Sequence, residues 1–79
     1  MTDKVYIIDI SVLTPEKHMS HLYEYYKTKE SAVNQLQFMF KFWGGSADVE
    51  SLEWESETEF RFRLNGYAYW YEFQTANLH

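Results

Sequence analysis

The dipeptide Asn65-Gly66 constrains this chain more than any other feature of its sequence. A two-residue type I′ turn needs positive φ at both central residues, and Asn followed by Gly adopts that conformation most readily. The turn sets Leu64 opposite Tyr67 and, farther along, Phe60 opposite Tyr71. Because side chains alternate along a strand, aromatic and apolar residues then line one face of the hairpin.

The other face of this hairpin is charged. In the same register Arg61 lies directly across from Trp70, which allows a cation–π contact, and Glu59 lies across from Glu72. The hairpin is therefore expected to present one face to a core and the other to solvent.

Residues 48–55 are predicted to add a strand before this hairpin. A three-residue loop at Ser56-Glu57-Thr58 would join the two strands. The resulting pairs are Trp54 with Phe60, Leu52 with Phe62 and Glu53 with Arg61. A two-residue loop would bury Glu53, so we expect the three-residue loop.

Residues 29–43 carry the clearest helical pattern. The residues that recur at helical spacing are Ala32, Val33, Leu36, Met39, Phe40 and Trp43. Thr28 is the expected cap before the helix, and Gly44-Gly45 is expected to end it in the left-handed conformation. Phe38 and Phe42 lie off the apolar stripe, so they either widen the buried face or remain exposed as a pair.

Residues 4–13 read as a strand because β-branched residues are frequent in them. Apolar residues stand on both of its faces near the start, which predicts either a central position in the sheet or partial cover of both faces. A second strand through residues 21–27 would form a hairpin with it across residues 14–20, although a short helix through residues 15–25 also satisfies the pattern. The tail from Thr75 to His79 is expected to be loosely held.

The predicted fold is α+β, with the order β-β-α-β-β-β and one helix packed on an antiparallel sheet. We assign residues 1–79 to a single domain, because separate cores need longer chains. Aromatic residues make up 20% of the chain and cysteine is absent, so the core depends on ring burial and not on disulfides. The chain has no long apolar run, and no signal-peptide pattern follows Met1, so we predict a cytoplasmic protein.

Signatures of catalysis are missing from the sequence. There is no glycine-rich phosphate loop and no Ser or Cys nucleophile in a recognisable setting. His18, His21 and Glu24 would share one side of a helix and could hold a metal there, but in a strand that spacing has no meaning. We therefore expect no enzyme activity, no cofactor and no metal.

Charge favours a basic partner over a nucleic acid or an anionic membrane. Seven Lys and Arg residues stand against twelve Asp and Glu residues, which gives a net charge of −5. Half of the acidic residues lie between Asp48 and Glu59. The candidate acidic residues for partner binding are Glu50, Glu53, Glu55, Glu57, Glu59 and Glu72. Under the alternative interpretation, these charges only solvate the sheet and guard its edge strand against aggregation.

Aromatic residues form the second candidate surface. Tyr23, Tyr25, Tyr26, Trp70 and the tyrosines of the last strand exceed what one helix can cover, so some rings should stay exposed, as at interface hot spots. Tyr23, Tyr25 and Trp70 are the candidate aromatic residues for partner binding. The alternative is that these rings complete a small core while their polar atoms reach water.

The stretch Tyr25-Tyr26-Lys27-Thr28-Lys29-Glu30-Ser31-Ala32-Val33, an aromatic strand end that runs into a capped helix, resembles small early proteins of bacteriophages and other mobile elements. The short, acidic, tyrosine-rich chain is similar in format to phage-encoded inhibitors of bacterial defence, including anti-CRISPR proteins. This resemblance implies a stoichiometric inhibitor in the host cytoplasm that occupies the working surface of a host effector.

Two other functions remain open at this point. One is a homo-oligomeric sponge for a nucleotide signal, whose pocket Lys27, Lys29, Arg61 and Arg63 would have to line. The other is a regulatory adaptor of the host, with a protein partner and no catalytic residue.

Overall fold

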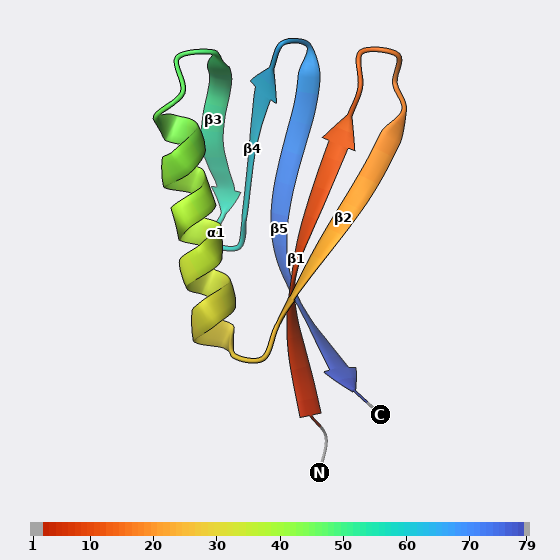
Figure 1. Cartoon of the computed structure of the whole chain (residues 1–79), viewed down its shortest axis with the longest axis vertical. Coiled ribbons are helices and arrows are strands. Elements are labelled where there is room, and N and C mark those ends of the chain that lie inside the picture. Colours follow the sequence, from red (N-terminus) through yellow and green to blue (C-terminus); the bar gives the residue numbers. More distant parts are fainter. Residues whose placement is uncertain (1–2, 79) are drawn as a thin grey trace.

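The computed structural model describes residues 3–78, which form a five-stranded antiparallel sheet with one helix on one of its sides (Figure 1). The sheet order is β2-β1-β5-β4-β3. The elements are β1 (Asp3–Leu13), β2 (Met19–Tyr26), α1 (Lys29–Gly44), β3 (Val49–Ser56), β4 (Glu59–Leu64) and β5 (Tyr67–Leu78). This arrangement confirms the predicted α+β class and the order of its elements. Among the described residues, no helix is long and apolar enough to cross a membrane.

β1 lies between β2 and β5, as the apolar residues on both of its faces predict. The turn into β2 is closed by a bond from the Thr14 N–H to the His18 carbonyl at 2.9 Å, and Lys17 adopts a φ of 68° within it. Residues 14–18 are therefore a loop, and the alternative of a helix through residues 15–25 is wrong.

The Asn65-Gly66 turn has the predicted conformation. Asn65 has a φ of 50° and Gly66 a φ of 85°. The register that follows sets Leu64 opposite Tyr67 and Phe60 opposite Tyr71, as expected. Local turn chemistry alone is thus enough to align this hairpin.

The end of the chain is paired, which corrects the prediction of a loose tail. β5 continues through residues 75–78 along β1, with Thr75 opposite Tyr6 and Leu78 opposite Asp3. The second edge of β1 supplies the backbone partners that these residues need. His79 lies outside the described residues.

β3 departs from its predicted connection to β4. Ser56 pairs with Glu59, so the turn has two residues, Glu57 and Thr58, where we predicted a three-residue loop at 56–58. An irregularity between Trp54 and Ser56 absorbs the extra residue. For that reason Trp54 still pairs with Phe60, and the predicted orientation of Glu53 toward Arg61 is kept.

A second irregularity removes the predicted pairing of Leu52 with Phe62. The register shifts between Glu50 and Glu53, and Ser51 adopts a φ of 57° there. Leu52 nevertheless packs against the core as a half-buried side chain. A bulge of this kind bends an edge strand and interrupts its pairing.

The core lies between α1 and the sheet and is largely aromatic. Leu36 of α1 is 2% exposed and joins a cluster whose other members are Ile8, Ile10, Phe60, Phe62 and Tyr71. Phe60 stacks on Tyr71 with ring centroids 4.7 Å apart, across the β4–β5 pairing. The predicted apolar stripe of the helix is therefore the buried one, with Ala32 and Leu36 at its centre.

The two ends of α1 differ in how well the sequence predicted them. The Thr28 hydroxyl accepts a hydrogen bond from the Ser31 N–H at 3.2 Å, which confirms the cap. The left-handed glycine stop is wrong: Gly45 has a φ of −84° and a ψ of −4°. Its N–H donates to the carbonyls of Lys41 and Phe42 and closes the last turn without positive φ.

Phe38 and Phe42 remain exposed on α1, at 59% and 58%. Of the two arrangements that the sequence allows, the exposed pair is therefore the observed one. Trp43, one residue further, turns toward the sheet, where its indole N–H donates to the Tyr71 hydroxyl at 3.1 Å.

Tyr26 makes folding sensitive to alkaline pH. Burial, together with the hydrogen bond that its hydroxyl donates to Glu24, raises the pKa of Tyr26 from 10.0 to about 12. The unfolded chain loses this proton near pH 10 and the folded chain holds it, so stability is complete below pH 10 and falls as pH rises toward 12.

We expect the thermal midpoint of the parent protein to drop across this window of pH. Tyr26→Phe should flatten the drop, because the titrating hydroxyl is gone, and melting curves followed by circular dichroism over a pH series would show it. An alkaline loss of the same size in Tyr26→Phe would assign the effect to other groups.

Candidate functional site

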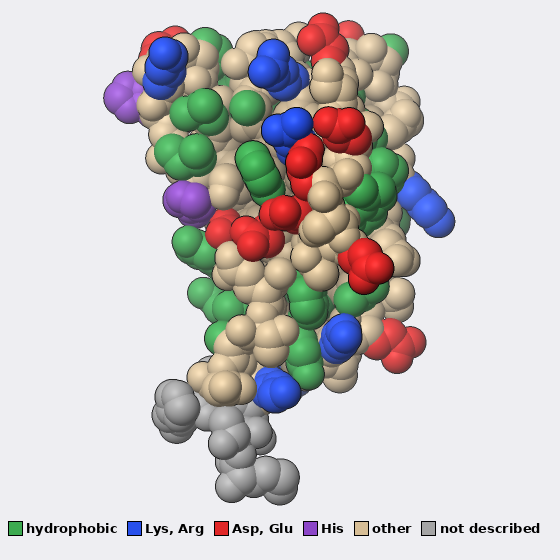
Figure 2. Space-filling view, turned by 180° about the vertical axis from the view of Figure 1, so that it is seen from behind, with side chains coloured by type: hydrophobic (Ala, Val, Ile, Leu, Met, Phe, Trp, Pro, Cys, Tyr) green, Lys and Arg blue, Asp and Glu red, His purple; other side chains and the backbone are tan. Residues whose placement is uncertain are grey.

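In the part of the chain that the structure describes, no helix lies over the face of the sheet opposite α1, and we call this face the open face. It carries the side chains that alternate with the core residues on each strand, for example Asp9 and Ser11, which flank Ile10. Figure 2 views this face and shows acidic side chains gathered over its middle, close to Lys and Arg side chains, with His side chains toward one side and hydrophobic side chains on both sides.

The strand register arranges the open face in rows across the sheet. One row runs from Tyr23 of β2 through Asp9 and Glu72 to Glu59 of β4. The neighbouring row runs from His21 through Ser11, Trp70 and Arg61 to Glu53 of β3. Residues far apart in the sequence thereby become direct neighbours, since side chains in one row lie on the same side of the sheet.

Arg61 is the centre of the charged part of the open face. Its guanidinium lies 3.4 Å from the Glu53 carboxylate and forms a second ion pair with that of Glu55. The same group stands over the Trp70 ring, 5.9 Å from its centroid, which confirms the predicted cation–π contact. One guanidinium thus contacts two carboxylates of an edge strand and an aromatic ring, and it links these three side chains across the sheet.

Trp70 links this charged part to the next row. Its indole N–H donates to the Glu59 carboxylate at 3.1 Å, while its ring is 41% exposed. The polar atom of the ring is satisfied within the protein, and its apolar surface faces solvent.

The structure brings most of the predicted partner-binding residues to this face, but not all of them. Those on the face are Glu50, Glu53, Glu55, Glu59, Glu72, Tyr23, Tyr25 and Trp70. Glu50 lies farthest along β3, opposite Arg63, and therefore shares the face of that residue. Glu57 lies in the β3–β4 turn, beyond the ends of both strands.

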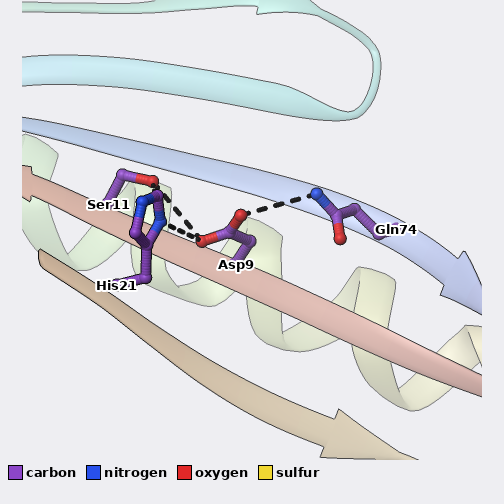
Figure 3. A network of polar contacts seen from close by, with 4 residues as sticks. All are labelled: Asp9, Ser11, His21 and Gln74. Atoms are coloured by element: carbon purple, nitrogen blue, oxygen red, sulfur yellow. Dashed lines mark hydrogen bonds and ion pairs between the residues drawn. The ribbon is translucent and has the colours of Figure 1, made fainter.

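A polar network that the sequence pattern did not predict lies beside these residues (Figure 3). The Ser11 hydroxyl and the Asp9 carboxylate lie 3.0 and 3.3 Å from Nδ1 of His21, and the Gln74 amide donates to Asp9 at 3.5 Å. The network joins β1 to both of its neighbours. The hairpin register that sets Ser11 opposite His21 is the signal that would have found it.

This Ser, His and Asp set does not have the geometry of a catalytic triad. In a triad, the serine and the carboxylate contact different nitrogens of the imidazole, so that the carboxylate orients the ring while its other nitrogen takes the serine proton. Here both groups approach Nδ1. The network therefore connects strands and fixes the His21 ring, which also stacks against Tyr23.

The metal set suggested by the sequence is not formed. His18 lies in the β1–β2 turn, and His21 and Glu24 project from opposite faces of β2, where Glu24 accepts the hydrogen bond of Tyr26. Within residues 3–78, no cluster of three His, Cys, Asp or Glu side chains could hold a metal ion.

A shallow hollow of about 630 Å³ lies on the open face. It is bordered by Ser11 and Met19 on the β2 side and by Arg61, Arg63 and Trp70 on the β4 side. Lys27 and Lys29, at the beginning of α1, do not border it. Within one chain, then, the four basic residues of a nucleotide pocket are not brought together.

The fold and this face define an α+β protein whose sheet is covered on one side only. The chain matches no protein-family model, and neither the search of curated proteins nor that of solved structures found a significant match. The residues of the open face therefore have to support any functional conclusion.

Proposed function

We propose that this chain is a non-enzymatic binding protein that docks through its open face on the basic surface of a protein partner. One observation carries the proposal: exposed aromatic rings and an excess of carboxylates share the one face of the sheet that the helix leaves uncovered.

The aromatic part of the face has the character of an interface. Tyr23 and Tyr25 are 46% and 66% exposed on β2, and Trp70 shows its ring at the middle of the sheet. Large rings on a rigid sheet supply contact area at little cost in conformational entropy, and Tyr and Trp are enriched among interface hot spots.

The charged part of the face determines whether a partner with a basic or an acidic surface is favoured. Its carboxylates are Asp9, Glu50, Glu53, Glu55, Glu59 and Glu72, whereas Arg61 and Arg63 are its guanidinium groups. Since Arg61 is shared between Glu53 and Glu55, acidic charge remains in excess. The resulting negative potential speeds association with a basic surface and disfavours acidic partners.

The specific form of this proposal is an inhibitor encoded by a phage or another mobile element. Its partner would be a bacterial effector whose basic surface normally holds nucleic acid, and the acidic face would occupy that surface. The resemblance in sequence format and the negative face both support this form. A regulatory adaptor of the host would use the same face, and the identity of the captured partner distinguishes the two.

We expect Glu50→Gln with Glu53→Gln to slow association with a partner captured from a bacterial lysate. The double change keeps size and polarity and leaves the Glu55–Arg61 pair in place, so the fold should survive. Removing two exposed charges should lower the association rate several-fold at low salt and reduce its salt dependence, because exposed charges are screened beyond about 8–10 Å near physiological ionic strength. Surface plasmon resonance over a salt series measures both quantities.

The matched control is Glu16→Gln with Glu30→Gln. It also removes two exposed carboxylates, but from the β1–β2 turn and the first turn of α1. A slower association in both double variants would show an effect of net charge alone. Unchanged kinetics in Glu50→Gln with Glu53→Gln would refute an acidic docking surface.

Arg61→Ala changes the charge of the same face in the opposite direction. It removes positive charge beside Glu53, so binding should be kept or strengthened if the partner is basic. Circular dichroism has to accompany this variant, because Arg61 also holds Glu55 and contacts Trp70. Folded Arg61→Ala with weaker binding would point to a partner of mixed or acidic charge.

A further inference from the structure

The two edges of the sheet are protected very differently. β3, at one edge, carries glutamates on its exposed side and is interrupted by a bulge at Ser51. β2, at the other edge, pairs without interruption with β1 along all eight of its residues. Charges and bulges are the usual means by which a sheet edge avoids pairing with another chain, and β2 has a single carboxylate and no bulge.

The side chains of β2 are also unusually apolar for an edge strand. Met19, Leu22 and Tyr25 are 56%, 61% and 66% exposed, respectively. Leu22 projects on the helix side of the sheet, but α1 does not cover it, since the tip of the β1–β2 hairpin points away from the helix (Figure 1). β2 thus offers apolar groups on both of its faces.

Every second residue of β2 directs its backbone N–H and C=O groups away from the sheet, where another strand could pair with them. The bond from the Thr14 N–H to the His18 carbonyl fixes the alternation, so Ser20, Leu22 and Glu24 exchange backbone bonds with β1. The N–H and C=O groups of the residues between them, such as His21 and Tyr23, therefore point outward from the sheet. Eight residues at about 3.4 Å each form an unpaired edge roughly 27 Å long.

We propose that a second copy of this chain pairs with this edge, β2 against β2 in antiparallel orientation, to give a twofold dimer with one continuous sheet. Two-fold pairing requires a strand that complements itself, and a register centred on Leu22 meets that requirement. It sets Leu22 opposite Leu22 of the other copy, Met19 opposite Tyr25, and Ser20 opposite Glu24. Apolar groups then meet apolar groups, sulfur meets an aromatic ring, and the glutamates do not face each other.

Charge also favours this edge for self-association. Each copy carries a net charge of −5, so two copies repel each other wherever acidic residues meet. The acidic residues of β3 lie at the opposite edge of the sheet, four strands away from the proposed contact. Near β2, the acidic Asp9, Glu16 and Glu24 stand against Lys17 and Lys27, whereas residues 45–58 around β3 carry five acidic residues and no Lys or Arg. The dimer therefore joins the two copies at the end of the sheet with the least net charge.

This dimer does not depend on the proposed partner. If both hold, the two open faces lie on the same side of the joined sheet, because a twofold axis perpendicular to a sheet keeps its faces. The Tyr23 residues of the two copies, each opposite His21, would then lie beside the twofold axis, and the acidic β3 strands would lie at the two outer edges of the joined sheet.

The absence of native cysteine allows a direct test by disulfide formation. In the proposed register Leu22 stands at a non-hydrogen-bonded position, where opposite Cα atoms are about 4.5 Å apart, within disulfide range. Leu22→Cys should cross-link under mild oxidation at least about tenfold faster than Phe38→Cys, because pairing makes the reaction effectively intramolecular. Phe38 is the matched control, since it is 59% exposed and lies on α1.

Leu22→Lys tests the same contact without a cross-linking reaction. It should give a monomer in sedimentation velocity at concentrations where the parent is a dimer, because two ammonium groups would face each other, while Phe38→Lys should remain dimeric. Both sites are exposed, and circular dichroism would verify the fold. A parent protein that stays monomeric at its highest soluble concentration, or equal cross-linking of Leu22→Cys and Phe38→Cys, would overturn the dimer. Parent-like dimerisation of Leu22→Lys would do the same.

Discussion

Leu36→Ala is expected to lower the free energy of unfolding by about 2–5 kcal/mol, because it removes a buried side chain from a core that cannot close around the cavity. Leu36 is 2% exposed and sits where α1 meets the sheet, in one cluster with Ile8 and Phe60. A chain of 79 residues has a total stability of roughly 4–12 kcal/mol at typical values per residue. The variant therefore loses a large part of its stability, and urea denaturation followed by circular dichroism measures the loss.

Phe38→Ala is the control for this prediction. It shortens a larger side chain two residues away on the same helix, but that side chain is 59% exposed. Its effect should stay within about 0.5 kcal/mol, as for other surface substitutions. Equal losses in Leu36→Ala and Phe38→Ala would mean that the helix packs through a different face.

Gly66→Val is expected to cost about 1–3 kcal/mol, the range for a side chain forced into an unfavourable backbone region. Gly66 has a φ of 85°, and a β-branched residue is a steric outlier at such an angle. A Cβ at this position would also lie 3.4 Å from Cγ of Pro15, so the β1–β2 turn limits any relaxation. The midpoint temperature of thermal unfolding and the midpoint urea concentration should both be lower in the variant than in the parent protein.

Gly45→Ala separates this effect from the general cost of replacing glycine. Gly45 has a φ of −84°, and an added Cβ would meet nothing closer than the Phe42 carbonyl at 3.6 Å. Stability should be kept or should rise by about 0.4–1 kcal/mol, because alanine restricts the unfolded chain. If Gly45→Ala were as damaging as Gly66→Val, the conformations assigned to both turns would be wrong.

The open face and the β2 edge would serve different contacts if both proposals hold. The face presents acidic and aromatic side chains, which are suited to a partner of opposite charge. The edge presents backbone groups and apolar side chains, which are suited to another strand. Leu22 projects to the helix side, so substitutions there leave the open face intact and separate self-association from partner binding.

The sequence by itself determined the features that depend on neighbouring residues. Asn65-Gly66 set the register of β4 and β5, since a two-residue turn leaves one way to align its strands. Thr28 set the beginning of α1, and the helical spacing of the apolar residues identified Leu36 as buried. Strand alternation was enough to place Arg61 across from both Trp70 and Glu53.

Only the tertiary structure decided the features that depend on distant partners. β5 extends through residue 78 because β1, at the other end of the chain, offers its free edge there. The polar network of Asp9, His21 and Gln74 needs three strands side by side, and no local pattern encodes that order. The bulge at Ser51 carries no glycine as a signal, and it allows Val49 and Leu52, which are three residues apart, to pack on the same core. Local backbone chemistry thus fixed the Asn65-Gly66 turn, the start of the helix and its buried face, whereas the pairing of distant strands fixed the strand order, the open face and the edge left free for another chain.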